Sequence, residues 1–403
     1  MAASGRILFV GEKFPHPLDD GGQIRTYHVL RALAAEFPTT LISLDAPSAE
    51  DERAIRDLGV EVVPCGPRRA SWTVPWFAAQ ALFTRAPYPM RKNFSRAILA
   101  EIRRRLAAGS VRALHLNHLD AAQYVEHLGP ARAGVRVVFD THNLLTQLYE
   151  RMAASAPDPI RRAYTIVQWW RMSRFEPAIL RAVDRALVCS DLERERLRVW
   201  GVDRALVVPN GVDVERFSPE GRRPSAEGAP ARIVFVGALS YAPNREAVRW
   251  LLDGILPELR AILPRFELTV VGKGAPGRLF ARARPGEVEI AGRVDDVRPF
   301  LARADVCAVP MKAGGGTRIK ILDSMAAGTP VVSTRVGAEG IDARDGESIV
   351  LADEAAAFAR AIADLARSPE RARSIAAAAR RLVEERYAWP RVLAPLVDGY
   401  RGD

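Results

Sequence analysis

Short apolar runs alternate with helical segments along this chain, and that alternation limits its possible folds more than any other feature. RILFV at 6–10 is followed by a helical stretch at 22–36, a run at 39–44, a helical stretch near 49–58 and a run at 60–64. Strands of a parallel sheet are often continuously apolar, because helices cover both faces of the sheet. The order strand, helix, strand therefore predicts an α/β fold with a parallel sheet.

The same alternation starts again in the second half of the chain, where RIVFVG at 232–237 resembles RILFVG at 6–11. Further strands of the first half are expected at 111–116, 135–140, 185–190 and 205–210. Those of the second half are expected at 267–272, 288–292, 305–310, 329–334 and 348–353. A length of 403 residues also favours two domains. We expect two doubly wound, Rossmann-like domains facing a cleft, with ligands beyond the carboxyl ends of the strands. The Pro/Gly/Ser/Arg-rich stretch 220–231 is expected to be a solvated linker.

Charge narrows the possible partners. The chain has 58 Lys and Arg against 48 Asp and Glu, a formal net charge of +10, which favours anionic partners such as nucleotides, nucleic acids or an acidic membrane face. The basic residues are dispersed, and no aromatic-basic motif of an RNA-binding domain is present, so a nucleic-acid-binding function is not expected.

The cysteines and the amino terminus point to a reducing compartment. Cys65, Cys189 and Cys307 are far apart and adjoin apolar stretches, so we expect free, buried thiols. The start MAASGRILFV does not have the pattern of a signal peptide, and no run approaches the length of a transmembrane helix. A cytoplasmic protein is therefore expected.

One segment favours contact with a membrane from the cytoplasmic side. Residues 68–96 place several aromatic side chains among arginines and a lysine. Such a pattern is typical of a helix lying on an anionic membrane surface. The alternative is an ordinary amphipathic helix packed on the sheet.

The stretch 311–334, MKAGGGTRIKILDSMAAGTPVVST, places three glycines and two cations at the start of a short helix. Thr317 is a candidate N-cap, and Arg318 and Lys320 then fall in the first turn, where the helix end is already positive. A bound anion would resolve this conflict. We predict that Arg318 binds a phosphate group bidentately and that Lys320 acts as a point charge. The alternative is a solvated face on which both cations pair with acidic neighbours.

Several motifs in order give the chain a resemblance to a known family. They are PHPLDDGGQIRTYHVLRALA at 15–34, FDTHN at 139–143, VVPNGVDVERFSPE at 207–220, FVGALSYAPN at 235–244 and GRVDDVRPFLARADV at 292–306. Together with the glycine-rich stretch, they resemble the GT-B glycosyltransferases of the family 4 type, also called group 1. The resemblance implies transfer of a sugar, with retention of configuration, from a nucleotide-sugar donor such as a UDP- or GDP-sugar to a saccharide or lipid-linked acceptor. It thus implies a role in polysaccharide or other glycan biosynthesis.

The resemblance also implies a division of the chain. Residues 1–210 would form the acceptor domain, joined by a carboxyl-terminal helix at 388–403, and residues 211–387 would form the nucleotide-sugar domain. The turn at Asn210 and Gly211 would connect the two. Pro390 suits the first turn of the last helix.

Site residues are expected at the carboxyl ends of strands. His142 follows a strand ending in Asp140, and its imidazole can bond a sugar hydroxyl. The predicted catalytic residues are His142, Arg318 and Lys320. The predicted substrate-binding residues are Gly21, Gly22, Arg25, Asn143, Gly237, Asn244, Gly314, Gly315, Gly316, Thr317 and Asp323. For Gly21 and Gly22 the alternative is a plain turn capped by Asp19 or Asp20, and for Asp323 it is an ion pair with Lys320.

Some positions depart from the family pattern. The Glu-x7-Glu motif falls on Gly315 and Asp323, and the usual basic loop after the first donor-domain strand is replaced by Ala238 and SYAPNRE. Arg318 and Lys320 are expected to take over phosphate binding, as in a subgroup with GGGTRIK-like motifs. The missing glutamate leaves two alternatives open, an inactive nucleotide-sugar-binding subunit and a nucleotide-sugar epimerase of the same fold.

No metal or other cofactor is expected, because the nucleotide-sugar is a co-substrate. The pair Asp295 and Asp296 favours a helix N-terminus over a metal site. His115 and His118 form the nearest metal-like spacing, and they are expected to cap a helix instead.

Overall fold

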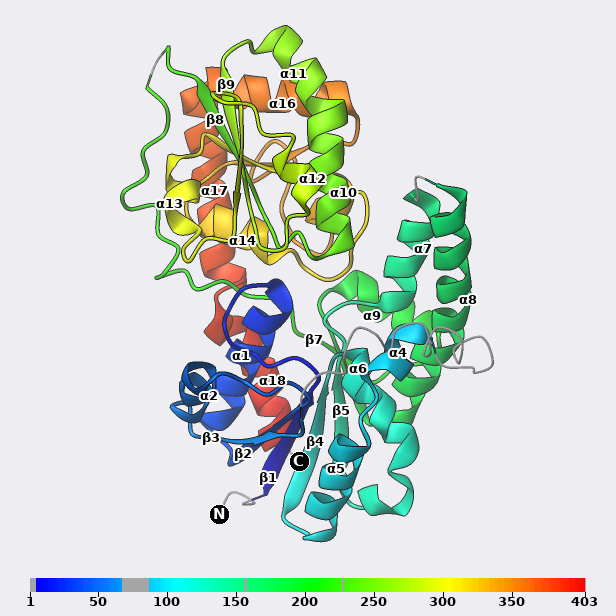
Figure 1. The fold of residues 1–403 in the computed structure, drawn as a ribbon. Coiled ribbons are helices and arrows are strands. Elements are labelled where there is room, and N and C mark those ends of the chain that lie inside the picture. The colour runs from blue at the N-terminus through cyan, green and yellow to red at the C-terminus, as the bar shows by residue number, and fades with distance from the viewer. Residues whose placement is uncertain (1–4, 67–86, 156–157, 227, 403) are drawn as a thin grey trace. The chain divides into compact units, whose positions relative to one another are not determined.

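The computed structural model describes residues 5–66, 87–155, 158–226 and 228–402. The chain forms two compact units. Unit 1 comprises Met1–Pro209 and Leu393–Asp403, and unit 2 comprises Asn210–Val392. Each unit is built on a parallel sheet covered by helices (Figure 1), so the predicted α/β architecture with two Rossmann-like domains is confirmed.

The sheet of unit 1 has seven strands in the order β3-β2-β1-β4-β5-β6-β7. The strands are β1 (Arg6–Gly11), β2 (Thr39–Ser43), β3 (Val60–Pro64), β4 (Val111–Asn117), β5 (Arg136–Asp140), β6 (Arg185–Val188) and β7 (Ala205–Val207). Their apolar runs lie inside: Ile7, Leu8, Phe9 and Val10 of β1 have no exposed surface. Burial on both faces explains why the runs are continuous and not alternating.

The helices of unit 1 connect these strands. They are α1 (Gly21–Ala34), α2 (Ala49–Arg56), α4 (Tyr88–Asn93), α5 (Arg96–Ala107), α6 (His118–Ala122), α7 (Leu145–Ser155), α8 (Pro159–Ala182) and α9 (Asp191–Val199), with short 3₁₀ turns at Gln123–His127 and Gly129–Arg132. The chain order reverses between the central strands β1 and β4, where Gly11 pairs with Asn117. Loops after the two strands diverge at such a point, and this is where ligands bind in doubly wound sheets.

Unit 2 repeats the same strand order with six strands, β10-β9-β8-β11-β12-β13. They are β8 (Ala231–Val236), β9 (Phe266–Val271), β10 (Val288–Gly292), β11 (Val306–Val309), β12 (Val331–Ser333) and β13 (Val350–Leu351). Its helices are α10 (Ala242–Trp250), α11 (Leu256–Ile262), α12 (Gly277–Phe280), α13 (Arg298–Arg303), α14 (Ile319–Ala326), α15 (Arg335–Ala338), α16 (Ala355–Arg367) and α17 (Pro369–Arg386), with a π-helical turn at Leu251–Ile255. The reversal lies between β8 and β11, so the loops after these strands occupy the ligand-binding position of this sheet.

The described residues of the stretch 220–231 are mostly exposed, as its composition predicts, but the stretch does not link the two units, whose boundary lies between Pro209 and Asn210. The backbone nitrogen of Arg223 donates to the carbonyl of Ala302 at 2.8 Å, and that of Ser225 donates to the Asp305 carboxylate at 2.8 Å. These bonds hold the stretch within unit 2. Its Pro, Gly and Ser content reflects an irregular, bonded segment and not a flexible connection.

The last helix, α18 (Trp389–Arg401), has a proline in its first turn, as expected for Pro390. In unit 1 the Tyr400 hydroxyl lies 2.8 Å from Nδ1 of His115, and Arg136 donates to the carbonyl of Gly399 at 2.8 Å. His115 is fully buried in β4 and stacks on Phe9. The expectation that His115 caps a helix is therefore wrong, because the residue anchors the end of α18.

The turn at Asn210 and Gly211 is tightly fixed within unit 2. Asn210 donates from its backbone nitrogen to the Thr317 hydroxyl at 2.8 Å and from its amide to the Thr317 carbonyl at 2.7 Å. A Cβ on Gly211 would lie 2.6 Å from the Trp389 ring. Only glycine fits beside this indole without displacement.

Gly211→Ala should therefore lower the thermal midpoint of unfolding. Overpacking against a buried ring costs about 1–3 kcal/mol, and in a unit of this size that corresponds to roughly 2–10 °C. Gly277→Ala is the matched control, because a Cβ there meets nothing within 4 Å. Equal midpoints for the two variants would show that Trp389 does not require glycine at 211.

Within the described residues, no helix is long and apolar enough to cross a bilayer. Most of the segment predicted to contact a membrane, 68–96, lies outside the described residues, since 67–86 are not described. No disulfide joins the three cysteines; Cys189 and Cys307 are buried as expected, and Cys65 is partly exposed.

Candidate functional site

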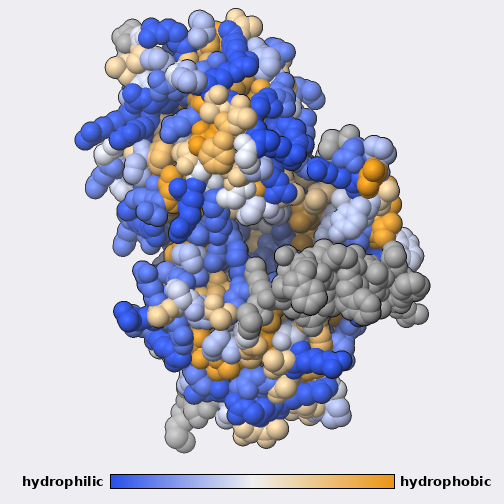
Figure 2. All heavy atoms as spheres, in the orientation of Figure 1, coloured by the Kyte–Doolittle hydropathy of each residue, from blue (hydrophilic) through white to orange (hydrophobic). Residues whose placement is uncertain are grey.

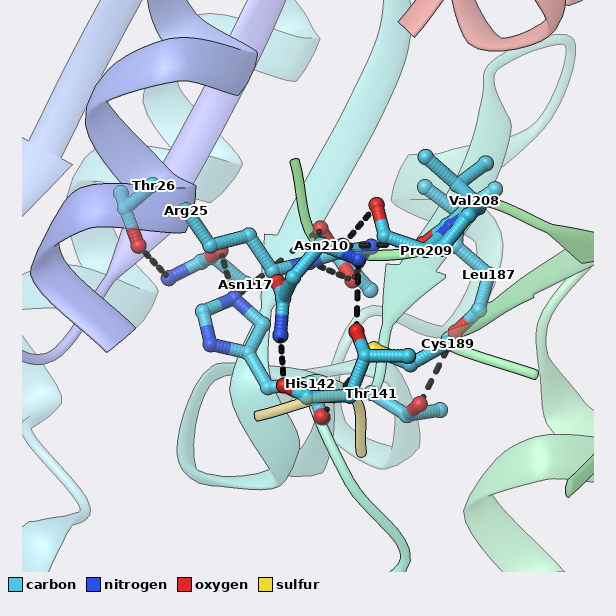
Figure 3. A network of polar contacts seen from close by, with 12 residues as sticks. Arg25, Thr26, Asn117, Thr141, His142, Leu187, Cys189, Val208, Pro209 and Asn210 are labelled. Atoms are coloured by element: carbon cyan, nitrogen blue, oxygen red, sulfur yellow. Dashed lines mark hydrogen bonds and ion pairs between the residues drawn. The ribbon is translucent and has the colours of Figure 1, made fainter. Parts of the chain in front are cut away.

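His142 lies at the carboxyl end of the unit 1 sheet, directly after β5, and has a positive φ of 56°. Such a backbone is uncommon outside glycine and is found at functional sites. The ring is held by a chain of hydrogen bonds (Figure 3). Nε2 lies 2.7 Å from Oδ1 of Asn117, whose amide nitrogen donates to Thr26 at 3.1 Å. Thr26 in turn donates to the carbonyl of Gly22 at 2.7 Å.

This chain of bonds sets the tautomer of His142. Because the Asn117 amide donates to Thr26, its oxygen is the atom that faces the ring and must accept from Nε2–H. Nδ1 then carries the lone pair. Burial lowers the pKa of His142 to about 3, so the ring is neutral at physiological pH. The side chain is 11% exposed. A neutral acceptor of this kind can bond a hydroxyl of a substrate.

Gly21 and Gly22 begin α1 next to this ring and are exposed. The Asp20 carboxylate caps the helix by accepting from the backbone nitrogen of Gln23 at 3.0 Å, so the capping alternative is correct for Asp20. A Cβ on Gly22 would lie 3.8 Å from Nδ1 of His142. Glycine therefore leaves the space in front of Nδ1 open, and the structure brings these predicted residues together.

Arg25 does not face this space, and the prediction that it binds substrate is corrected. Its guanidinium is 1% exposed and donates to Asp140 at 2.8 and 3.0 Å and to the carbonyl of Val208 at 2.9 Å. Although burial opposes ionisation, the charge of Arg25 holds the pKa of Asp140 at about 2. Arg25 thus joins α1 to the ends of β5 and the segment after β7. Arg25 and Asp140 thus form a buried ion pair within unit 1.

Asn143 follows His142 and is partly buried. Among the described residues, its side-chain oxygen Oδ1 has no hydrogen-bond partner. A buried polar atom without a partner costs free energy unless a ligand or water satisfies it. Asn143 therefore remains a substrate-binding candidate.

His118 and Asp120 lie near His142, and the sequence indicated neither of them as a site residue, because His118 was expected only to cap a helix. His118 has a φ of 72°, its Nδ1 lies 2.9 Å from the Asp120 carboxylate, and its ring centre lies 5.7 Å from that of His142. Burial opposes a charge here, but the bond to Asp120 raises the pKa of His118. The available signal was the position of Asn117, His118 and Asp120 at the end of a central strand.

In unit 2, Lys320 is the centre of the predicted site. Its ammonium group donates to the side-chain oxygen of Asn244 at 2.7 Å and lies 4.4 Å from the centre of the Phe235 ring. Burial, together with the charge of Arg318, lowers the pKa of Lys320 to about 7. Asn244 is held in turn by its bond to the carbonyl of Ala238 at 2.8 Å. A cation with one neutral partner retains charge that an anion could neutralise.

Gly237, the residue after β8, makes room for this arrangement. A Cβ on Gly237 would lie 2.5 Å from Nζ of Lys320 and 2.9 Å from the amide nitrogen of Asn244. The three predicted residues Gly237, Asn244 and Lys320 thus meet at the carboxyl end of the sheet. We call these three residues the lysine cradle.

Gly237→Ala should weaken binding of UDP or GDP by about ten-fold, because the methyl group displaces Nζ from its position. The displaced atom is the end of a flexible side chain, so the fold should be retained. Calorimetric titration checks this, with Gly277→Ala as the control in the same unit. If Gly237→Ala binds both nucleotides as the control does, the lysine cradle does not hold the diphosphate.

Arg318 is turned away from the position that the sequence predicted. Helix α14 begins at Ile319 with Arg318, not Thr317, at its N-cap, and Thr317 instead accepts from Asn210. Arg318 is 6% exposed and donates to the carbonyls of Gly315 at 2.5 Å, Gly316, and Val336 at 3.1 Å. The prediction that Arg318 binds phosphate bidentately is therefore corrected. Its guanidinium instead holds the loop of Gly314, Gly315 and Gly316, which we call the glycine loop.

The glycine loop needs glycine at two of its positions. Gly314 has a φ of 139° and Gly316 a φ of 65°, both in the region that disfavours other residues. A Cβ on Gly314 would lie 3.0 Å from the Arg318 guanidinium. The loop is thus shaped around Arg318, and Gly315 between them is partly exposed.

The acidic candidates of unit 2 differ in their surroundings. Burial raises the pKa of Asp323 to about 8. In the described part of the chain, Lys320 bonds Asn244 and no ion pair joins it to Asp323. Asp296 lies one residue before Val297, the N-cap of α13, and accepts from the backbone nitrogen of Arg298 at 2.9 Å, so it lies at the helix terminus as predicted but not at the N-cap or in the first turn. The described residues contain no group of three or more His, Cys, Asp or Glu placed to hold a metal ion.

Comparison with family models gives two matches in order along the chain. Residues 20–216 match "Glycosyltransferase Family 4", and residues 230–368 match "Glycosyl transferases group 1". Curated relatives include phosphatidyl-myo-inositol mannosyltransferase of Mycolicibacterium smegmatis, 32% identical over 225 residues, which are 53% of this chain and 56% of that protein. Another is D-inositol 3-phosphate glycosyltransferase of Saccharomonospora viridis, 28% identical over 307 residues, 71% of this chain and 69% of that protein. The chain thus spans little more than half the length of the mycobacterial relatives, 56% and 58% of two of them.

Solved structures agree on the fold. Sucrose-phosphate synthase of Thermosynechococcus elongatus superposes with a TM-score of 0.74 at 18% identity, covering 99% of this chain and 98% of that one. Anabaena Alr3699/HepE in complex with UDP-glucose superposes with a TM-score of 0.69 at 13% identity, covering 99% and 100%. At these identities the likeness shows the fold alone. The two family matches and this fold together identify the chain as a member of the glycosyltransferases of the group 1 and family 4 type.

Proposed function

We propose that this protein transfers a sugar from a UDP- or GDP-sugar to a saccharide or lipid-linked acceptor in glycan biosynthesis, with retention of anomeric configuration. The observation that carries the proposal is the lysine cradle. Lys320 bonds a neutral amide and lies beside a glycine at the carboxyl end of the unit 2 sheet. This is where a doubly wound domain binds nucleotides.

In this proposal unit 2 is the donor domain. The ammonium group of Lys320 faces the diphosphate, and the glycine loop held by Arg318 offers backbone to the phosphate oxygens. During transfer an acceptor hydroxyl oxygen bonds the anomeric carbon on the face from which the diphosphate departs, and the bond from that carbon to the diphosphate oxygen breaks. The nucleoside diphosphate leaves with the electron pair, and its departing oxygen takes up the hydroxyl proton. The Lys320 cation stabilises the charge that develops on the leaving group.

Unit 1 is the acceptor domain in this proposal, and it also presents His142 to the sugar. Nδ1 accepts a hydrogen bond from a sugar hydroxyl, which orients the ring for attack. The proposal includes no metal and no protein nucleophile. Asp323 remains the candidate for the ribose hydroxyls of the donor.

Similar proteins support the proposed sugar transfer. Two relatives are named phosphatidyl-myo-inositol mannosyltransferase and D-inositol 3-phosphate glycosyltransferase. The Anabaena neighbour was solved with UDP-glucose bound.

The GGGTRIK-like motif is proposed to mark a subgroup that uses the lysine cradle in place of the missing basic loop. We also propose a cytoplasmic enzyme in peripheral contact with the membrane.

Incubation with radiolabelled UDP- and GDP-sugars tests the proposal, with and without a lipid acceptor extract. The expected result is labelled product and free nucleoside diphosphate with one donor, increased by the extract. Tight donor binding without turnover under every condition would indicate an inactive subunit, and conversion of the donor to its epimer would indicate an epimerase. Either result would contradict the proposal.

A further inference from the structure

Helix α8 has an exposed face of unusual composition. Most of the large apolar side chains that are exposed in the described part of the chain lie on this helix. Ile160 is 82% exposed, Tyr164 49%, Ile166 42%, Val167 44% and Trp170 56%. Residues three and four positions apart lie on one side of a helix, so these five side chains form a single band. We call this band the α8 face, and Figure 2 shows hydrophobic surface where α7 and α8 lie in Figure 1.

The opposite side of α8 is buried and mixed in composition, with Thr165, Gln168 and Glu176 beside the core residues Met172, Ile179 and Leu180. Glu176 accepts from the backbone nitrogens of Leu145 and Thr146 at 2.9 and 2.8 Å and so caps the start of α7. Gln168 accepts from the backbone nitrogen of Tyr88 at 3.3 Å. The buried apolar residues and these polar contacts together fix which side of α8 packs on the unit, so the five side chains of the α8 face are left toward solvent.

The α8 face also carries charge of one sign. From Pro159 to Phe175 the helix contains four arginines and no acidic residue. Arg174 lies over the Trp170 ring, 4.0 Å from its centre, and donates to the Trp170 carbonyl at 2.9 Å. Arginine beside an exposed tryptophan matches a boundary between an apolar and an anionic medium.

We propose that the α8 face docks on an anionic membrane surface, with its apolar side chains at the level of the lipid headgroups. Such surfaces are bound in two ways: exposed apolar side chains are buried among the headgroups, and basic side chains are attracted to the anionic lipids. Charge complementarity favours the membrane over a second copy of this chain, because two α8 faces would bring the like charges of Arg162, Arg171 and Arg174 together; Arg161 already pairs with Asp158 at 3.3 Å. This docking of the α8 face rests on the proposed function only in that the proposed acceptor is lipid-linked.

Vesicle flotation tests whether the α8 face binds a membrane. The assay contains no donor or acceptor, so its outcome is separate from that of the transfer assay. Wild type should float with vesicles of phosphatidylcholine and phosphatidylglycerol and not with phosphatidylcholine alone. Ile160→Ser/Trp170→Ser and Arg162→Glu/Arg171→Glu should each bind at least about ten-fold more weakly, since each removes one of the two attractive terms. Val199→Ser is the control, because Val199 is 81% exposed on α9, like Ile160 at 82%.

Circular dichroism melting should show that all variants remain folded. The proposal is overturned if both double variants float as Val199→Ser does, or if wild type binds neither vesicle or both equally. It is also overturned if wild type is a dimer without lipid and Ile160→Ser/Trp170→Ser is a monomer. In that case the α8 face is an interface between copies.

Discussion

Replacement of Lys320 by methionine is expected to lower the rate of sugar transfer by about 10²–10³-fold, the effect of removing a single preorganised charge-stabilising group. Methionine keeps the length of the side chain and removes the charge. The loss should be large because Lys320 is partly buried and is the cation of the lysine cradle. Release of nucleoside diphosphate at saturating donor measures the rate.

Lys312→Met is the matched control. Lys312 lies in the same loop after β11, is exposed, and has its ammonium group 3.9 Å from the centre of the Trp250 ring. Its replacement should leave the rate within about two-fold, as for a surface charge. Equal loss in both variants would show that general charge, not the lysine cradle, supports transfer.

His142→Ala should lower turnover by about 10²-fold or more and leave the affinity for free UDP or GDP unchanged. The ring belongs to unit 1 and is proposed to contact the sugar, and the nucleotide is proposed to bind unit 2. An interaction made in the transition state but not with the free nucleotide appears in kcat and not in nucleotide affinity. Steady-state kinetics and calorimetry on the same preparation give both values.

Two further variants separate contact from structure at this position. His127→Ala removes an exposed histidine of unit 1 and should behave as wild type. Asn117→Ala removes the acceptor that fixes Nε2–H, so it should lower turnover less than His142→Ala and without loss of nucleotide affinity. A parallel fall of turnover and nucleotide affinity in His142→Ala would indicate a structural role instead.

Much of the fold follows from the sequence because buried parallel strands need continuous apolar runs. Every run expected to be a strand forms one, from RILFV in β1 to SIVLAD in β13. One prediction about the organisation of the chain failed, that 220–231 is a linker. Its composition resembles a linker, but backbone hydrogen bonds to Ala302 and Asp305 hold it within unit 2. Composition reports the absence of regular structure and not the absence of contacts.

The candidate site could be located from the sequence more reliably than its side chains could be oriented. Lys320, Asn244 and Gly237 meet as expected, because the strand order brings the loops after β8 and β11 together. Arg318 and Arg25 were expected to face a ligand, but each finds carbonyls or a carboxylate inside its own unit. These partners are distant in sequence or in irregular loops, so no local pattern indicates them.

The α8 face shows the same limit in another form. Apolar residues lie on both sides of this helix: Met172, Ile179 and Leu180 are buried with Gln168 and Glu176, while the α8 face is exposed. Sequence periodicity gives the two sides of a helix. It does not determine which side packs against the protein when apolar residues lie on both.

Calorimetric titration of UDP and GDP as a function of pH tests most directly whether the lysine cradle holds the diphosphate. The pKa of Lys320 is about 7 in the unbound protein, and the protonated form is the one that attracts an anion. Affinity for wild type should therefore fall between about pH 7 and pH 9, by up to about ten-fold per unit, while the diphosphate itself stays fully ionised. Lys320→Met, at matched ionic strength, should bind about ten- to a hundred-fold more weakly at the lower pH and show no such fall. If folded Lys320→Met binds as tightly as wild type with the same dependence on pH, the diphosphate site is elsewhere and the central claim is wrong.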